Sequence, residues 1–306
     1  MFARTYPRPM RNILTILALL ITLSMQAQVY ERLEAHATDY YDHAEWSDVI
    51  SVTDRMVRIH PEDIHPYSMA LIAAQFIDDI ATESRYLVLS QRNGVPIDQL
   101  MADIYDRTRL LHDTRIYEAI LIDLKTDNHW LAKVLNHYLL DYYAFSRRFD
   151  QAITVADELL SVTPHNIRYT KIKANALFGL GNTDASVTLY NKILTDNPSD
   201  YDALTFLGAY YSVQTEKELA EIDSLYLKSE NPVDSVFNLQ KQLIIDTEVP
   251  YVLSLLYRAY NIRRSCYLEE QITSLESLSP RLPNHPSKRH SLLLRIKNHL
   301  EERPKE

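Results

Sequence analysis

One fixed interval between helix-breaking residues constrains the fold more than any other feature of this chain. The interval is 34 residues, and it separates Pro164, Pro198 and Pro232. Counting back from Pro164 in the same steps, with one step of 35, reaches Trp130, Pro96 and Pro61. Because proline cannot continue a helix, each one closes a segment of the same length. Such a segment accommodates two helices and their turns, so we expect hairpins that pack on their neighbours.

The apolar residues between the prolines recur at helical spacing. Residues 133–164 contain a first stripe formed by Leu135, Leu139, Leu140 and Tyr143. After Ser146-Arg147-Arg148, a second stripe consists of Ala152, Val155, Ala156 and Leu159. Stripes of this kind predict two helices that face each other across a short turn. The small alanines allow the two helices to approach closely.

Residues 198–232 add a specific pattern to this period. Between the two prolines the chain has Leu204, Leu207-Gly208, Tyr211 and Ala220. This arrangement resembles the tetratricopeptide pattern W-x2-L-G-x2-Y…A…P, with Leu204 in the Trp position. The resemblance implies an all-α protein, a right-handed α-α superhelix of about seven helical hairpins over residues 28–280. A capping helix and a basic tail would follow in residues 281–306.

The layout of residues 201–248 leaves two alternatives. A capping box at Thr215–Glu218 would begin a separate helix there. The absence of glycine and proline between Gly208 and Ser229 instead favours one elongated hairpin. Its helices would cover residues 202–229 and 233–246, with Pro250 and Pro280 framing a further pair. We favour the elongated hairpin, which resembles the long penultimate hairpin of many exported bacterial tetratricopeptide proteins.

The N-terminus has the three parts of a secretory signal. A basic start at Met10–Asn12 precedes an apolar run from Ile13 to Leu23, and Ser24–Ala27 offers a cleavage site. The run would extend about 17 Å as a helix, too short for a bilayer core of about 30 Å. We therefore expect residues 1–27 to be a signal peptide, with residues 1–9 an upstream misannotated start. The mature chain would be periplasmic or secreted, without a membrane span, and without a lipid anchor because no cysteine lies near the cleavage site.

No residue pattern in the sequence indicates a catalysed reaction or an ion-binding site. The chain has none of the common nucleophile, nucleotide or zinc motifs and only one cysteine, Cys266. His36 and His43 lie two helical turns apart, but their acidic neighbours are typical of any charged surface. A net charge of −9 is unfavourable for nucleic-acid binding. We expect a protein that is not an enzyme, with no cofactor, no catalytic residue and no metal site.

The resemblance also implies where a partner would bind. In tetratricopeptide arrays the first helix of each hairpin lines a concave groove, and the matching positions here are Tyr41, Phe76, Leu110, Phe145, Phe178 and Tyr260. Polar companions are His137, Asp141, Arg168, Lys171 and Asn175. We expect an envelope protein or peptide in this groove, with Arg168 and Lys171 meeting an acidic group. The alternative is a glycan-binding accessory protein of an outer-membrane uptake system, although such proteins are normally longer and carry a lipoprotein cysteine.

Overall fold

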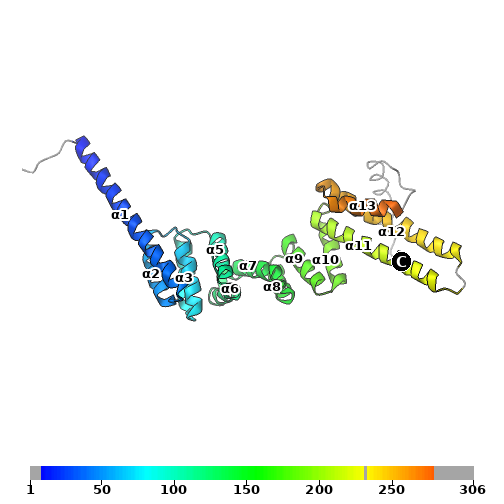
Figure 1. Ribbon diagram of the computed structural model, residues 1–306, viewed down its shortest axis with the longest axis horizontal. Coiled ribbons are helices and arrows are strands. Elements are labelled where there is room, and N and C mark those ends of the chain that lie inside the picture. Colours follow the sequence, from blue (N-terminus) through cyan, green and yellow to red (C-terminus); the bar gives the residue numbers. More distant parts are fainter. Residues whose placement is uncertain (1–7, 231–232, 279–306) are drawn as a thin grey trace, which may run out of the picture. The chain divides into compact units, whose positions relative to one another are not determined.

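The computed structural model describes residues 8–230 and 233–278, with side chains from residue 24 onward. Every regular element in these residues is a helix (Figure 1). In chain order they are α1 (Arg8–Asp42), α2 (Trp46–Ile59), α3 (His65–Phe76), α4 (Ile80–Arg92), α5 (Ile97–Leu110), α6 (Arg115–Asp127), the 3-10 helix η1 (His129–Leu131), α7 (Ala132–Phe145), α8 (Phe149–Val162), α9 (Ile167–Gly179), α10 (Thr183–Asp196), α11 (Tyr201–Lys228), α12 (Asp234–Ile262) and α13 (Cys266–Leu278). The all-α prediction is confirmed, and the helices follow one another as a series of hairpins.

The turns inside the first five hairpins share one backbone conformation. A residue with positive φ, between 56° and 82°, stands in each turn: Ala44, Asp78, His112, Arg147 and Gly181. In every case the next residue donates its N–H to the carbonyl five positions back, over 2.8–3.1 Å. This is the Schellman arrangement, which ends a helix by satisfying its last carbonyl groups. Its return every 34 or 35 residues shows the repeat in the backbone itself.

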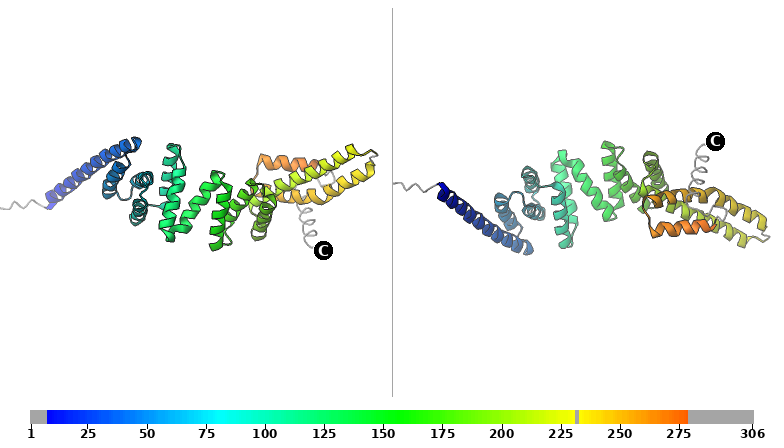
Figure 2. Two further views of the ribbon diagram at one scale, coloured as in Figure 1. Left: turned by 90° about the horizontal axis from the view of Figure 1, so that it is seen from below. Right: turned by 90° about the horizontal axis from the view of Figure 1, so that it is seen from above.

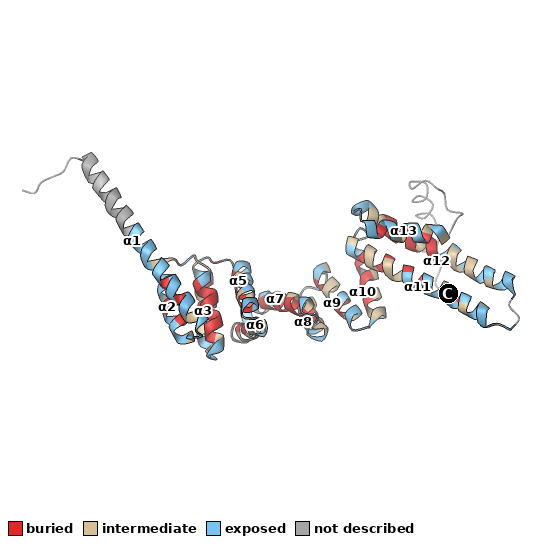
Figure 3. Cartoon of the chain, in the orientation of Figure 1, coloured by how far each residue is buried: buried red, intermediate tan, exposed pale blue. Residues whose placement is uncertain are grey.

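The chain divides into two compact units, residues 1–155 and residues 156–306. In the first unit the most enclosed helix is α3, where all nine residues from Pro66 to Ala74 are buried (Figure 3). Helices α2, α4, α5 and α6 all pack against it. In the second unit a core of buried residues joins α9 and α10 to α11, α12 and α13. A helix surrounded on all sides has no polar face to keep, which explains the apolar composition of α3.

The two stripes predicted in residues 133–164 are confirmed. The four side chains of the first stripe, on α7, are 0–6% exposed. Those of the second stripe, on α8, are 0–5% exposed. The sequence period therefore gives the correct phase for both helices of this repeat.

Helices α11 and α12 form one elongated hairpin, which confirms the favoured layout. The two yellow helices run side by side in both views of Figure 2. However, the expectation that Pro250 begins a new helix was wrong, because α12 continues through it to Ile262. Proline inside a helix costs about 3 kcal/mol or more, since it removes a hydrogen bond and clashes with the preceding turn. Pro250 lies within the buried stretch from Val249 to Ala259, where packing offsets that cost.

This correction changes the number of hairpins. The described residues contain six, from α1/α2 to α11/α12, followed by α13, where about seven were predicted. The predicted capping helix and basic tail of residues 281–306 lie outside the described residues, as does Pro280.

The predicted signal segment is continuous with the first repeat. Helix α1 begins at Arg8 and ends at Asp42 without interruption, so it covers the expected cleavage region near Ala27. None of the helices in the described part of the chain combines the length and the apolar character needed to cross a membrane. Cleavage and export remain predictions.

Candidate partner-binding groove

An aromatic groove opens between α5, α6 and α7 in the first unit, with a volume of about 280 Å³. We call it the α5–α7 groove. Its lining consists of Asp98, Met101, Ala102 and Tyr105 on α5, Tyr117 on α6, and Tyr138, Asp141, Tyr142 and Phe145 on α7. Helices α5 and α7 are the first helices of consecutive hairpins, and the sequence resemblance predicts partner binding on such helices.

Buried tyrosines form the base of the α5–α7 groove. The ring of Tyr117 meets Tyr105 edge to face at 5.3 Å between centroids and Tyr142 at 5.8 Å. Tyr117 and Tyr142 are only 5% and 7% exposed. Phe145, in contrast, is 80% exposed at the rim. The base is rigid because its rings are packed, and the exposed ring is available to a ligand.

The charged groups that line the groove are all acidic. Tyr138 donates its hydroxyl hydrogen to the carboxylate of Asp98, and burial together with Asp98 raises the pKa of Tyr138. Burial, followed by the nearby Tyr138 and Asp141, raises the pKa of Tyr117. The phenols therefore stay protonated, in a field that is negative. Asp141 also lies 3.7 Å from Nε2 of His137, one turn earlier on α7.

The predicted groove residues of the first unit have different environments. Phe145 lines the α5–α7 groove, and Leu110 is 75% exposed at the end of α5. Phe76 is 43% exposed and stacks on Trp46 with the ring centroids 4.1 Å apart. All three side chains are exposed to solvent. Tyr41 differs, because its hydroxyl is buried without a hydrogen-bond partner and burial raises its pKa to about 12.

In the second unit, two of the predicted binding residues already have partners. Lys171 on α9 forms ion pairs with Asp200 and Asp202 at 2.8 and 2.7 Å. Asn175 accepts a hydrogen bond of 2.6 Å from the hydroxyl of Tyr190. An acidic ligand would have to displace two carboxylates from Lys171. These contacts join α9 to α10 and α11, which gives both residues a role in holding the unit together.

The other two predicted residues of this unit are exposed to solvent. Arg168 is exposed on α9. Phe178 is 49% exposed, and its ring meets Phe206 edge to face at 5.2 Å. Phe145 and Phe178 are thus exposed aromatic side chains at the ends of α7 and α9. Binding by any of these residues stays a prediction.

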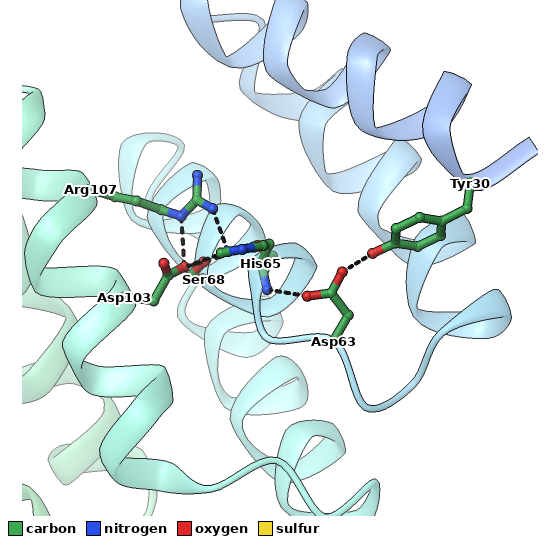
Figure 4. Close-up of polar contacts among 6 residues, drawn as sticks. All are labelled: Tyr30, Asp63, His65, Ser68, Asp103 and Arg107. Carbon is green, nitrogen blue, oxygen red and sulfur yellow. Dashed lines mark hydrogen bonds and ion pairs between the residues drawn. The ribbon is translucent and has the colours of Figure 1, made fainter. Parts of the chain in front are cut away.

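A second polar cluster connects α3 to α5 (Figure 4). The carboxylate of Asp103 accepts hydrogen bonds from the hydroxyl of Ser68 and from Nε of Arg107, the latter at 2.7 Å. Although burial opposes it, these bonds hold the pKa of Asp103 below its ordinary value. A second guanidinium nitrogen of Arg107 donates to Nδ1 of His65 over 2.9 Å.

This cluster contains serine, histidine and aspartate but lacks the geometry of a hydrolase triad. In a triad the serine donates to the histidine and the aspartate holds the other ring nitrogen. Here Ser68 donates to Asp103 instead, and it is fully buried. His65 is further held by Asp63, which accepts from its backbone N–H at 3.1 Å and from the hydroxyl of Tyr30 (Figure 4). The arrangement therefore fastens α1 and α3 to α5.

Among the described residues, no three or more His, Cys, Asp or Glu side chains lie close enough together to hold a metal ion. Cys266 is an exposed free thiol at the start of α13. The α5–α7 groove, which combines aromatic and acidic side chains from three helices, is the candidate site for a partner.

Sequence reasoning found Phe145 and Asp141 but missed most of the groove. The missed residues follow a simple rule. On α5 they are Asp98, Met101, Ala102 and Tyr105, and on α7 the lining residues are Tyr138, Asp141, Tyr142 and Phe145. Both sets have the spacing i, i+3, i+4, i+7, which places four side chains on one helix face. Two such faces on consecutive first helices were a detectable signal.

Comparisons with known proteins give only remote likenesses. No family model matches the chain, and no curated protein matches it. A Bacteroides ovatus crystal structure, described as a proposed protein-binding protein, has a TM-score of 0.45 and 17% identity, covering 71% of this chain and 98% of that one. The TPR2AB domain of yeast Sti1, in complex with pHSP90, has a TM-score of 0.27 and 13% identity, covering 82% of this chain and 97% of that one. The assignment of a helical-repeat fold therefore depends on the helices and turns described above.

Proposed function

We propose that this protein is a non-catalytic scaffold of the bacterial cell envelope that binds an extended segment of a partner protein in the α5–α7 groove. The observation that carries the proposal is an exposed phenylalanine, Phe145, above a base of buried tyrosines. Aromatic side chains in desolvated pockets dominate the energetics of protein interfaces. Helical-repeat proteins commonly bind partners on such surfaces. This is an analogy between folds, and the α5–α7 groove supplies the particular surface to which it applies.

The shape of the groove favours a peptide over a glycan. Sugar rings need a flat aromatic face, and the tyrosines at the base meet one another by their edges, within 5.3–5.8 Å. Tyr117 and Tyr142 are buried, so their faces are covered by neighbouring side chains. Only Phe145 presents most of its ring to solvent. A groove with one exposed ring and polar groups suits a side chain of a partner protein.

The test compares partners captured by matched variants. The tagged full chain would be purified from the envelope of its own bacterium as wild type, Phe145→Ala and Leu227→Ala. Leu227 is 81% exposed on α11, against 80% for Phe145, and is the control for losing an exposed apolar side chain. We expect a partner protein that co-purifies with wild type and with Leu227→Ala but not with Phe145→Ala. The same partner, purified separately, should bind the purified wild-type chain. Retention by Phe145→Ala and loss on deleting residues 281–306 would assign the interface to the basic tail.

Export has a separate test. Mass spectrometry of the protein isolated from its own cells should find an N-terminus near Gln28, which follows the predicted cleavage region. A mature chain that still contains Arg11 would contradict export by this signal.

Soluble glycans that compete with the captured protein would favour the glycan-binding alternative.

A further inference from the structure

We propose that the α5–α7 groove selects a basic side chain, lysine or arginine, of its partner. This inference rests on the proposed function and specifies the chemistry of the group that enters the groove. It reverses the sign of the charge that Arg168 and Lys171 had suggested from sequence. The reasons are the charges, the aromatic rings and the size of the groove.

The charged side chains that line the groove are both carboxylates. Asp98 and Asp141 stand on opposite walls, α5 and α7, and no lysine or arginine belongs to the lining. Asp98 accepts a hydrogen bond from Tyr138, which fixes its carboxylate at the groove edge. A carboxylate pair that flanks an aromatic surface attracts a cation and repels an anion.

The aromatic rings favour the same ligand. Five of the nine lining residues are aromatic, namely Tyr105, Tyr117, Tyr138, Tyr142 and Phe145. An ammonium or guanidinium group placed over the exposed ring of Phe145 is attracted by the negative face of that ring, and the attraction grows when water is excluded. The aliphatic stem of lysine or arginine would meanwhile lie against Met101 and Ala102.

The size of the groove is compatible with the entry of one partner side chain. Its volume of about 280 Å³ is enough for one lysine or arginine side chain. Lys171, which the sequence had suggested for an acidic group, is already engaged by Asp200 and Asp202. Charge complementarity therefore points to a basic partner segment at the α5–α7 groove.

The experiment uses a random library of 12-residue peptides panned on the full chain, with Phe145→Ala as the counter-selection. Enriched peptides should share a lysine or arginine. For one such peptide, replacing that residue by citrulline or norleucine should raise the Kd about tenfold, measured by fluorescence anisotropy. Asp98→Asn should raise the Kd for the original peptide by about threefold or more and leave the Kd for the neutral peptide unchanged.

A matched control separates the groove from general electrostatics. Asp106 lies on α5, the helix that also carries Asp98, but it does not line the groove. Its side chain is exposed and forms an ion pair with Arg109 at 3.3 Å. Asp106→Asn should leave the Kd within about twofold of wild type. Enriched peptides without a basic residue, or a citrulline peptide that binds equally well, would overturn the charge proposal while retaining the groove. If no peptide discriminates wild type from Phe145→Ala, the proposed function fails as well.

Discussion

Helices α7 and α12 carry the same kind of apolar stripe and bury it to opposite extents. On α7 the stripe comprises Leu135, Leu139, Leu140 and Tyr143, and these side chains are 0–6% exposed. On the first half of α12 the stripe comprises Val236, Leu239 and Leu243, which are 50–72% exposed. Helical spacing alone therefore does not decide burial. The buried residues of α12 all lie in its second half, from Val249 to Ala259.

The difference follows from the number of neighbouring helices. A hairpin covers only one face of each of its helices, so a further helix must cover the rest. In the second unit α13 packs on both α11 and α12 and encloses the part of the hairpin that holds the core. Towards the tip, Leu225 and Leu227 on α11 are as exposed as the stripe on α12 (Figure 3). Burial in this protein is a property of the stack and not of the single hairpin.

The largest predicted difference in the free energy of unfolding is between two leucine-to-alanine substitutions, one on α7 and one in the first half of α12. Leu139→Ala should lower the free energy of unfolding by about 2–5 kcal/mol, because the leucine is only 2% exposed and leaves a cavity. Leu239→Ala should cost less than about 1 kcal/mol, since that side chain is 72% exposed. Urea titrations followed by circular dichroism measure both. Equal losses would mean that the tip is covered in solution.

A buried carboxyl group gives the next effect, and it depends on pH. Glu83 on α4 is 1% exposed, and burial, followed by the nearby Asp123, Asp79 and Asp78, raises its pKa to about 8. The folded protein therefore keeps a proton that the unfolded chain releases near pH 4.5. The stability associated with this proton is complete below that pH and is lost as the pH rises through about 8.

The test of this carboxyl group compares two glutamine variants. Relative to wild type, Glu83→Gln should gain stability between pH 5 and pH 9, on the order of 2–4 kcal/mol. Glu221→Gln, at an exposed position on α11, should not show such a gain. Chemical denaturation at pH 5, 7 and 9 gives the comparison. If Glu83→Gln keeps the wild-type pH dependence, the carboxyl group is accessible to water.

The smallest effect tests the close contact at the base of the elongated hairpin. Gly208 on α11 faces Leu256 on α12, and a Cβ atom at Gly208 would come within 2.6 Å of a Leu256 methyl carbon. Leu256 is fully buried and has little room to move. Gly208→Ala should therefore cost about 1–3 kcal/mol through overpacking. Ser235→Ala, at an exposed position near the tip, should lower the melting temperature less than Gly208→Ala does. An unchanged melting temperature for Gly208→Ala would contradict the close packing of Gly208 against Leu256.

The amino-acid sequence by itself determined the repeat, the class of fold and the phase of the helices. Prolines 34 residues apart and apolar stripes at helical spacing are local signals, and each depends only on nearby residues. The same signals gave the correct phase for Leu139 and the elongated hairpin after Gly208. The repeat resemblance also assigned Phe145 to a groove position, and the structure shows that this side chain is exposed.

Only the tertiary structure decided which neighbours each face would meet. Pro250 continues a helix because the surrounding core compensates for the lost hydrogen bond. Lys171 is held by Asp200 and Asp202, which are separated from it by a whole helix in sequence. The α5–α7 groove likewise needs two helices brought together, and the spacing of residues on each helix does not show that the two faces meet. Contacts between distant residues depend on packing, and packing is a property of the whole stack.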